Sequence, residues 1–216
     1  LAGEQAANEV QDGMKVGLGS GSTVYWMVKR LGERVQQGLK VEGIPSSNQT
    51  EQWAKEFGVP LTDFSQVDYL DVTIDGADEV DENLNLIKGG GGALFREKVI
   101  AEAAKKFVII VDQSKVVTQL GAYPLPVEVL PFGWEMAAKS IEALGCEWKL
   151  RRRNNEIFVT DNGNYILDCD FGMIPNPEEL HKQLKMIVGV VETGLFANMA
   201  DKVIIGGRET TKTIEA

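Results

Sequence analysis

The chain has 216 residues, of which 44% are hydrophobic and 25% charged, a composition typical of a globular protein with a buried core. Its formal net charge of −10 at pH 7 excludes a general attraction to nucleic acid or to an anionic membrane. No run of 18 apolar residues is present, so we expect no membrane-spanning helix. An anionic substrate would need local positive charge, such as an isolated lysine or arginine beside glycines.

The start of the chain and its rare residue types narrow the possible functions further. Residues 1–4 lack the basic start and apolar stretch of a signal peptide, and because no Met begins them we expect a few residues to precede them. Two distant cysteines, Cys146 and Cys169, predict a cytoplasmic protein without a disulfide. The single histidine, His181, is predicted on the surface of a helix, which excludes Ser-His-Asp triads and multi-histidine metal sites.

Short apolar strands alternate with amphipathic helices in the first half of the chain. Predicted strands cover 15–17, 41–44, 69–74 and 107–111, and predicted helices cover 24–33, 49–57 and about 93–106. Gly58 is predicted to end the second of these helices. The alternation is typical of crossover units, so the fold class is predicted to be α/β, with a Rossmann-like, doubly wound, mostly parallel sheet.

The pattern changes near residue 124. A helix over 134–144, a strand over 146–152, two strands joined by a hairpin turn at Asn162-Gly163 and a helix over 177–186 predict a smaller α+β domain. Residues 202–206 are predicted to form a last strand that returns to the first sheet. We therefore expect a Rossmann-like catalytic domain of residues 1–124 plus 202–216, and an α+β domain of residues 125–201 on the oligomerisation or lid side.

Glycines and hydroxyl side chains follow the first predicted strand, in Gly-Leu-Gly-Ser-Gly-Ser-Thr (17–23). Backbone N–H groups at the start of a helix bind anions, and the hydroxyl groups add donors. The segment is neither a Walker loop, since no lysine precedes the Ser-Thr pair, nor a good dinucleotide fingerprint, since the third glycine is misplaced. The alternative is a tight turn with a helix cap, and we favour phosphate binding at Ser20, Gly21, Ser22 and Thr23.

An acidic segment, Asp75-Gly76-Ala77-Asp78-Glu79, follows the third predicted strand. Ligands of open parallel sheets bind beyond the carboxyl ends of the strands. The spacing of the acids does not fit an EF-hand. Asp75 and Asp78 are predicted to accept hydrogen bonds from sugar hydroxyls, whereas Asp81 and Glu82 are predicted to form a solvated turn.

Four consecutive glycines, 89–92, lie between Lys88 and the helix that carries Glu97. Such a run is a flexible linker or a close approach of backbone to a ligand, and its place before a helix favours the ligand. At 100° per residue, Glu97 lies in the middle of the apolar face of that helix. The residues predicted to lie outside this face are Arg96, Lys98, Glu102 and Lys106.

A carboxylate on an apolar face is unusual. Partial burial would raise its pKa towards the range that suits a general base, and the alternative is a buried ion pair, for example with Lys88. Lys88 is predicted to neutralise charge on a substrate oxygen, or else to form a Schiff base as in an aldolase. Lys115 follows another strand and is predicted either to bind the substrate or to lie on the surface. For residues 151–153 (Arg-Arg-Arg), a solvated strand end is favoured over an anion patch.

Together, the segments 17–23, 73–79 and 87–98 resemble ribose-5-phosphate isomerase, type A. Further matching motifs lie at 112–115, 124–129, 159–164 and 194–198, so that the resemblance covers nearly the whole chain. It implies reversible conversion of D-ribose 5-phosphate to D-ribulose 5-phosphate in the pentose phosphate pathway. It also implies a homodimer or homotetramer that uses neither metal nor cofactor.

The resemblance also implies roles for individual residues. Glu97 is expected to move a proton between C2 and C1 through an enediol(ate), with Lys88 and Asp75 as further catalytic residues. We assign Lys88 to the developing enediolate and the loop 20–23 to the phosphate. The residues expected at the phosphorylated pentose are Ser20, Gly21, Ser22, Thr23, Asp75, Gly76, Ala77, Asp78, Lys88, Gly89, Gly90, Gly91 and Lys115.

Two other functions stay open on sequence alone. A sugar-phosphate deaminase or an acyl-CoA transferase could use a related sheet, but the deaminase commonly needs a histidine for ring opening, and the transferase would exchange CoA. A sugar-phosphate sensor domain would bind its ligand without turnover. Such a sensor is normally attached to a DNA-binding segment, which this acidic chain lacks.

Overall fold

The computed structural model describes residues 1–207 and 210–216, and these form two compact units. Unit 1 comprises Leu1–Ala77, Arg96–Val116 and Met199–Ala216, and unit 2 comprises Asp78–Phe95 and Val117–Asn198. Residues 208–209, which belong to the expected domain segment 202–216, lie outside the described residues. Each unit is built around its own sheet.

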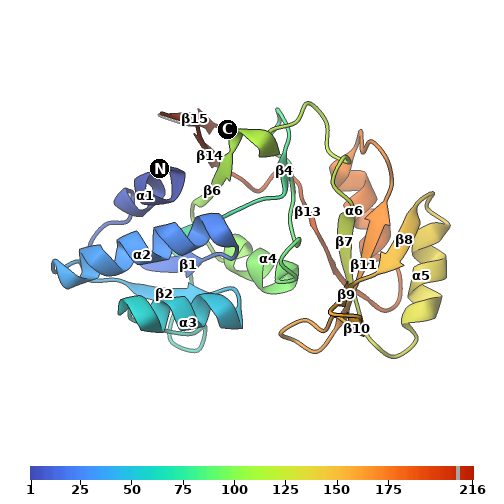
Figure 1. Cartoon of the computed structure of the whole chain (residues 1–216), viewed down its shortest axis with the longest axis horizontal. Coiled ribbons are helices and arrows are strands. Elements are labelled where there is room, and N and C mark those ends of the chain that lie inside the picture. Colours follow the sequence, from blue (N-terminus) through green and yellow to red (C-terminus); the bar gives the residue numbers. More distant parts are fainter. Residues whose placement is uncertain (208–209) are drawn as a thin grey trace. The chain divides into compact units, whose positions relative to one another are not determined.

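A mostly parallel sheet forms the centre of unit 1 (Figure 1). Its described strands are β1 (Lys15–Leu18), β2 (Glu42–Pro45), β3 (Val72–Asp75), β6 (Phe107–Asp112), β14 (Lys202–Gly206) and β15 (Thr211–Glu215). They lie in the order β2-β1-β3-β6-β14-β15, and β15 alone among them pairs antiparallel. Because β2 and β3 lie on opposite sides of β1, the switch point of the sheet falls between β1 and β3, where open sheets bind ligands.

Helices cover both faces of this sheet. The helices α1 (Ala2–Asn8), α2 (Ser22–Gln36) and α3 (Asn48–Phe57) contribute to one apolar cluster with β1, β3, β6 and β14. On the other face lies α4 (Leu94–Glu102), whose residues from Arg96 onward belong to unit 1. The Thr73 hydroxyl of β3 donates to the carbonyl of Ile100 in α4 over 2.7 Å. The sheet is thus buried on both sides, as its continuous apolar strands require.

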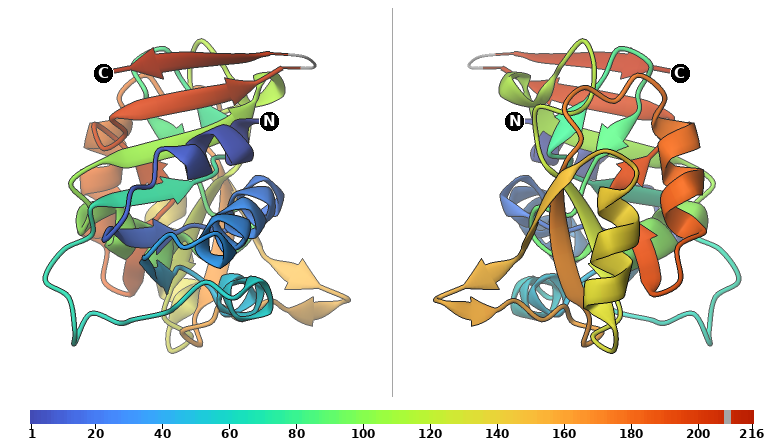
Figure 2. Two further views of the ribbon diagram at one scale, coloured as in Figure 1. Left: turned by 90° about the vertical axis from the view of Figure 1, so that its left-hand side faces the viewer. Right: turned by 90° about the vertical axis from the view of Figure 1, so that its right-hand side faces the viewer.

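Unit 2 contains an antiparallel sheet in the order β12-β7-β11-β8. Its strands are β7 (Leu125–Val129), β8 (Glu147–Leu150), β11 (Tyr165–Asp170) and β12 (Val190–Thr193), and its helices are α5 (Trp134–Glu142) and α6 (Pro177–Lys185). A smaller sheet joins β4 (Glu79–Val80), β5 (Leu86–Ile87) and β13 (Leu195–Phe196) in the order β13-β5-β4. A hairpin of β9 (Arg152–Arg153) and β10 (Glu156–Ile157) extends away from the larger sheet (Figure 2).

Most elements expected from the sequence are confirmed, including the mostly parallel α/β sheet, the smaller α+β part and the return of residues 202–206 to the first sheet, where β14 pairs with β6. Gly58 ends α3 in the left-handed conformation, with φ 73° and ψ 27°. The helix α4 is shorter than the expected 93–106, because residues 103–105 pair their backbone with Leu70. None of the helices within the described ranges is long and apolar enough to cross a bilayer.

The division into units differs from the expected boundary at residues 124/125. Residues 78–95 and 117–124 belong to unit 2 because β5 pairs with β13 and the carboxylate of Glu79 accepts the N–H groups of Gly121 and Tyr123, over 2.8 and 2.7 Å. The expected boundary was drawn from local composition, which does not indicate pairing between segments that are distant in the sequence. The catalytic and lid or oligomerisation roles of the two parts stay predictions.

The hairpin expected around Asn162-Gly163 is wrong in its pairing. Residues 160–164 do form a turn, but β11 pairs with β7 and β8, whereas β10 pairs with β9. The turn between β9 and β10 consists of Asn154 and Asn155, both at positive φ (52° and 64°). Asparagine tolerates this left-handed conformation, so the hairpin turn forms at Asn154-Asn155 rather than at the expected Asn162-Gly163.

The prediction of a surface position for His181 is also wrong in part. Its ring is half-buried, and Nδ1 lies 2.8 Å from the hydroxyl of Thr193. The helical pattern alone placed the residue on α6 but could not indicate that β12 would cover it. Both cysteines are free, as expected, and both are buried.

Replacing Gly58 by Ala should lower the free energy of unfolding by about 1 kcal/mol, because a side chain with Cβ is disfavoured in the left-handed conformation. Urea denaturation measures the change. Gly58→Asn is the matched control, since asparagine tolerates this conformation and should lose less. Equal losses for the two variants would contradict the role of the left-handed helix end.

Candidate functional site

Loops that follow β1, β2 and β3 meet at the carboxyl edge of the sheet in unit 1. The N–H of Gly19 donates to the carbonyl of Ile74 over 2.9 Å, and the hydroxyl of Thr50 donates to the carbonyl of Gly19 over 2.7 Å. The hydroxyl groups of Ser20 and Ser46 lie 2.7 Å apart. The switch point predicted from the sheet order is therefore lined by hydroxyl groups and backbone amides.

Asp75, at the end of β3, holds this edge together. Its side chain is fully buried, and Oδ1 accepts the N–H groups of Ser20, over 3.0 Å, and Gly76, over 2.7 Å. A Cβ at Gly19 would lie 2.6 Å from the Cα atom of Asp75 and would overlap its carboxyl group. The glycine at position 19 is thus required by the close approach of Asp75, which links the loop after β1 to the end of β3.

The predicted phosphate loop forms the start of α2. Gly21 precedes this helix at φ 94° and has no side chain with which to cap the N–H groups of its first turn. Ser20, Ser22 and Thr23 lie half-buried or exposed at the same place. A 15-residue helix places partial positive charge at such an end, so the loop is suited to a phosphate or another small anion.

Glu97 lies on the buried side of α4 and is only 5% exposed. The helix runs antiparallel to β3, because Leu70 bonds to Ala103 and, further along the strand, Thr73 bonds to Ile100. Glu97 is one turn before Ile100 on the same helix face, which places it beside the end of β3, where Asp75 lies. Near the start of the helix, Arg96 donates to the side chain of Asn48, the first residue of α3, over 3.1 Å.

Lys98 was expected outside the apolar face of α4, but it is 7% exposed. The expectation was wrong because it defined the buried face of the helix by its apolar residues alone, so that a charged residue beside that face was expected in solvent. Positions 97 and 98 are both buried, whereas Val99 is 38% exposed. The buried side of α4 is therefore more polar than its sequence pattern predicted.

Lys88, in unit 2, follows β5 and is only 2% exposed. Its N–H donates to the carbonyl of Gly194 over 2.8 Å, and its ammonium group lies 5.5 Å from the centre of the Phe196 ring. A buried lysine is rare in proteins, and contact with an aromatic face partly offsets the loss of water. The sequence had indicated Lys88 as functional but not that β13 would enclose it.

The glycine run after Lys88 packs closely against its own unit. The N–H of Gly90 donates to Oδ2 of Asp78 over 2.8 Å, and a Cβ at Gly90 would lie 2.6 Å from both Asp78 Oδ1 and the hydroxyl oxygen of Tyr123. Burial raises the pKa of Tyr123, and the carboxylate of Asp78 adds to this effect. Gly91 has open space around it and is exposed. The run is thus an ordered loop rather than a linker.

Lys115 ends the 3-10 helix Gln113–Lys115 directly after β6, in unit 1, and is half-buried. The carboxylate of Asp112 accepts the N–H and the hydroxyl of Ser114, and the hydroxyl contact is the main reason why the pKa of Asp112 lies below its ordinary value. This turn holds Lys115 at the same carboxyl edge as the loops after β1, β2 and β3.

The solvated turn expected at Asp81 and Glu82 is confirmed for Glu82 alone. Asp81 is 7% exposed, and its carboxylate accepts the N–H groups of Asn83 and Asn85, over 2.9 and 2.8 Å. This pattern is an Asx-turn, in which an aspartate replaces backbone bonds. The spacing of Asp81 to the two asparagines was a signal that the sequence analysis missed.

Arg151, the first of three consecutive arginines, is not the solvated strand end that was expected. Its side chain is 13% exposed and forms an ion pair with Asp168 of β11 at 2.5 Å. It also donates to the carbonyl groups of Gly89 and Gly90. The sequence did not indicate Ser46, which meets Ser20 in unit 1, or Arg151 and Tyr123, which contact the glycine run within unit 2. Only the folding of each unit brings these side chains to their partners.

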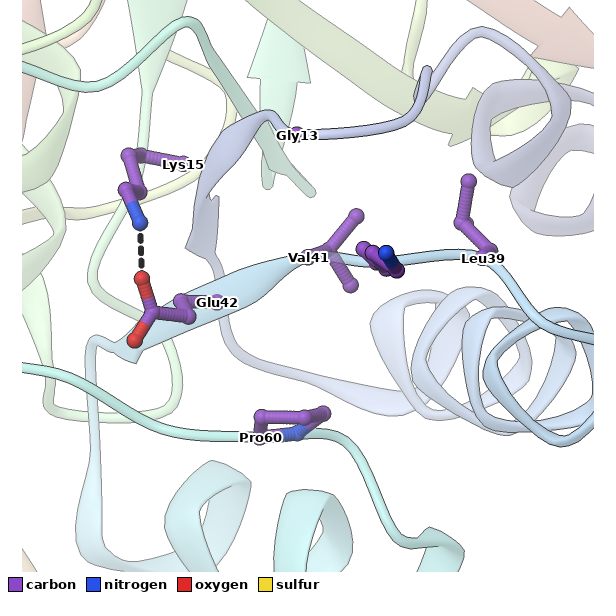
Figure 3. A pocket seen from close by; sticks show the side chains of 7 residues that line it. Gly13, Lys15, Leu39, Val41, Glu42 and Pro60 are labelled. Carbon is purple, nitrogen blue, oxygen red and sulfur yellow. Dashed lines mark hydrogen bonds and ion pairs between the residues drawn. The ribbon is translucent and has the colours of Figure 1, made fainter.

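A pocket of about 390 Å³ lies elsewhere in unit 1, at the amino ends of β1 and β2. Figure 3 shows the side chain of Lys15 directed at Glu42, with which it forms an ion pair. The pocket is at the edge of the sheet opposite to Asp75 and to the loops at the carboxyl ends of the strands, so it is not the candidate site. Among the described residues, no group of three His, Cys, Asp or Glu side chains is arranged to hold a metal ion.

Known proteins resemble this chain over nearly its whole length. Residues 42–210 match the family model of ribose 5-phosphate isomerase A (phosphoriboisomerase A). The chain is 67% identical to ribose-5-phosphate isomerase A 1 of Oceanobacillus iheyensis over 96% of this chain and 93% of that protein. It is 54% identical to ribose-5-phosphate isomerase A of Bacillus mycoides, over 98% and 96% of the two chains.

Solved structures of similar proteins share the fold. Ribose 5-phosphate isomerase A of Methanocaldococcus jannaschii superposes with a TM-score of 0.95 at 38% identity, over 100% of this chain and 96% of that chain. A D-ribose-5-phosphate isomerase in complex with phospho-erythronic acid superposes with a TM-score of 0.96 at 41% identity, with the same coverage. Each of these likenesses extends over both units.

Replacing Gly19 by Ala should lower the free energy of unfolding by about 3 kcal/mol, because the added methyl group would overlap Asp75. Gly13→Ala is the control. Gly13 has φ +84° with open space around it, so this variant should lose only about 1 kcal/mol from backbone strain. Denaturant titration of both variants measures the difference, and a loss at Gly19 no larger than at Gly13 would contradict the close approach.

Proposed function

Because this chain belongs to the ribose 5-phosphate isomerase A family and is an enzyme of the aldose–ketose isomerase class, we propose that it interconverts D-ribose 5-phosphate and D-ribulose 5-phosphate with Glu97 as the base. The observation that carries this proposal is the buried carboxylate of Glu97, held on α4 beside the end of β3. The complex of a similar enzyme with phospho-erythronic acid, a phosphorylated sugar acid, supports the substrate class.

In the proposed reaction, Glu97 removes the proton from C2 of the open-chain aldose, and the electron pair forms the C1–C2 double bond. Negative charge then develops on the oxygen of C1, giving an enediol(ate). Glu97 returns its proton to C1 while C2 becomes the carbonyl, and the hydroxyl proton of C2 is transferred to the oxygen of C1. One carboxylate serves both carbon atoms because they are adjacent.

Three further assignments complete the proposal. The loop with Ser20, Gly21, Ser22 and Thr23 binds the phosphate through the first-turn N–H groups of α2. Lys88 neutralises the developing enediolate, since a buried ammonium group interacts strongly with charge in a site shielded from water. Asp75 accepts a hydrogen bond from a sugar hydroxyl. The N–H groups of Ser20 and Gly76 set the orientation of its carboxylate.

The remaining predicted residues are assigned to the same substrate. They are Gly76, Ala77, Asp78, Gly89, Gly90, Gly91 and Lys115. Asp78 follows Asp75 by three residues, so the chain keeps their Cα atoms within roughly 10 Å. We assign Asp78 two roles: it contacts the substrate, and its Oδ2 accepts the N–H of Gly90 and so holds the glycine run.

The wider setting is part of the proposal. We place the enzyme in the pentose phosphate pathway and in the cytoplasm, as a homodimer or homotetramer without metal or cofactor. Residues 1–124 and 202–216 are assigned to catalysis, and residues 125–201 to the lid or oligomerisation side.

Glu97→Gln should reduce kcat for ribose 5-phosphate by about 10⁴-fold, because the amide cannot accept the C2 proton. Binding of phospho-erythronic acid, measured by calorimetry, should persist. Glu102→Gln is the matched control, because Glu102 is on the same helix but exposed, and it should retain activity. Turnover by Glu97→Gln at the wild-type rate would remove Glu97 from its role.

Proton NMR in D2O with EDTA tests the reaction class. We expect the ketose to appear with deuterium at C1, because the proton held by Glu97 exchanges with solvent in part of the turnovers. Formation of ketose in EDTA would support independence from a metal. Absence of ketose both with and without EDTA would contradict the proposed function.

A further inference from the structure

The backbone of the loop 88–92 is costly to order, because four of its five residues are glycines. Four consecutive glycines lose more conformational freedom on folding than any other residues would, and Gly89 and Gly92 have φ of 101° and 86°. Residues 89–92 have no side chains that could fix their backbone. Within the loop, the N–H of Gly92 donates to the carbonyl of Gly89 over 2.9 Å. Contacts from other segments of unit 2 orient the carbonyl and the N–H of Gly90.

Arg151 supplies these contacts from the end of β8. Its Nη1 donates to the carbonyl of Gly89 over 2.9 Å and to that of Gly90 over 3.1 Å. Its Nε and Nη2 donate to Oδ2 and Oδ1 of Asp168, over 2.9 and 2.5 Å. The planar guanidinium group thus spans a carboxylate on one side and two consecutive carbonyl groups on the other, which the single ammonium group of lysine cannot do.

The opposite side of the loop is also closed. The N–H of Gly90 bonds to Asp78, and the hydroxyl of Tyr123 leaves no room for a Cβ at Gly90. A Cβ at Gly92 would overlap the ring of Phe158. The backbone N–H of Phe158 donates to the carbonyl of Arg151 over 3.0 Å. The loop is therefore held between Arg151 and Asp78.

Fixing a carbonyl also fixes the next N–H. A peptide unit is planar and trans, so its C=O and N–H groups point in opposite directions. With the carbonyl of Gly89 on Arg151, the N–H of Gly90 points to Asp78, as observed. With the carbonyl of Gly90 on Arg151, the N–H of Gly91 must point away from Arg151, on the exposed side of the loop.

We propose that Arg151, held by Asp168, is a positioning residue for the isomerase reaction, which sets the direction of the Gly91 N–H and the place of Lys88 at the start of the loop. This inference rests on the proposed function of Lys88 and Gly91 at the substrate. Arg151 acts through the loop backbone. It is one of three adjacent arginines, whereas its neighbour Arg152 is exposed and donates to the carbonyl of Asn155 in its own hairpin.

The kinetic test compares Arg151→Lys with Arg152→Lys, which changes the same residue type one position further along. In Arg151→Lys, kcat should fall by about 100-fold, because small displacements of reacting groups have effects of this size. KM should change by less than about threefold, since phosphate binding is assigned to the loop of unit 1. Arg152→Lys should keep both constants. A kcat for Arg151→Lys within about threefold of wild type, in a folded protein, would overturn the inference.

A second variant and a second measurement distinguish loss of positioning from loss of folding. Asp168→Asn removes the charge that orients Arg151, and it should also lower kcat. This variant replaces Arg151→Lys in the test if Arg151→Lys does not fold. Hydrogen exchange of the peptide covering 88–94 should be faster in the Arg151 or Asp168 variant than in wild type or Arg152→Lys, at a temperature well below unfolding. Unchanged exchange in that peptide would also overturn the inference.

These outcomes differ from failure of the proposed function. If wild-type enzyme fails to convert ribose 5-phosphate, or if Glu97→Gln retains full activity, the proposed reaction or its base is wrong. The hydrogen-exchange comparison still decides whether Arg151 orders the loop. If wild type is active and Glu97→Gln is not, an unaltered kcat in Arg151→Lys rejects the positioning role alone.

Discussion

The carboxylate of Asp75 is the constraint on which the candidate site in unit 1 depends. It is fully buried at the end of β3 and accepts the N–H groups of Ser20 and Gly76, so the loop after β1 is held against the end of β3. A buried carboxylate is costly unless hydrogen bonds compensate for lost water, and these two amides supply part of that compensation. The absence of a side chain at Gly19 follows directly from this packing.

Several charged side chains are buried around this edge and in unit 2, and their burial opposes stability. Glu97 and Lys88 are 5% and 2% exposed, although ordinary packing would place apolar residues there. The burial of each group is consistent with the role proposed for it, Glu97 as a base and Lys88 as a cation shielded from water. In unit 2, the Arg151–Asp168 pair and Asp78 order a glycine run that would otherwise be flexible. Unit 1 thus uses backbone amides, and unit 2 an ion pair and a carboxylate, to hold polar groups in place.

Much of the fold was predictable because it depends on local pattern. Continuous apolar strands, the left-handed glycine after α3 and the alternation of strands and helices indicated the parallel sheet and its ligand-binding edge. Errors arose where tertiary contacts decide. Asp81 and Lys98 are buried although their neighbours suggested solvent, and residues 78–95 pack with unit 2 because β5 pairs with β13, which lies more than a hundred residues further along the chain.

Residue types and spacing alone indicated the chemistry proposed for this chain: one glutamate on an apolar helix face, a lysine before four glycines, and a glycine-rich turn at the start of a helix. These are local features, and local features are visible in a sequence. Only the tertiary structure decided which groups support them. Arg151 reaches the carbonyl groups of residues some sixty positions earlier, and Ser46 meets Ser20 at the edge of the sheet. Such contacts form when distant strands pair, and no periodicity in the chain encodes them.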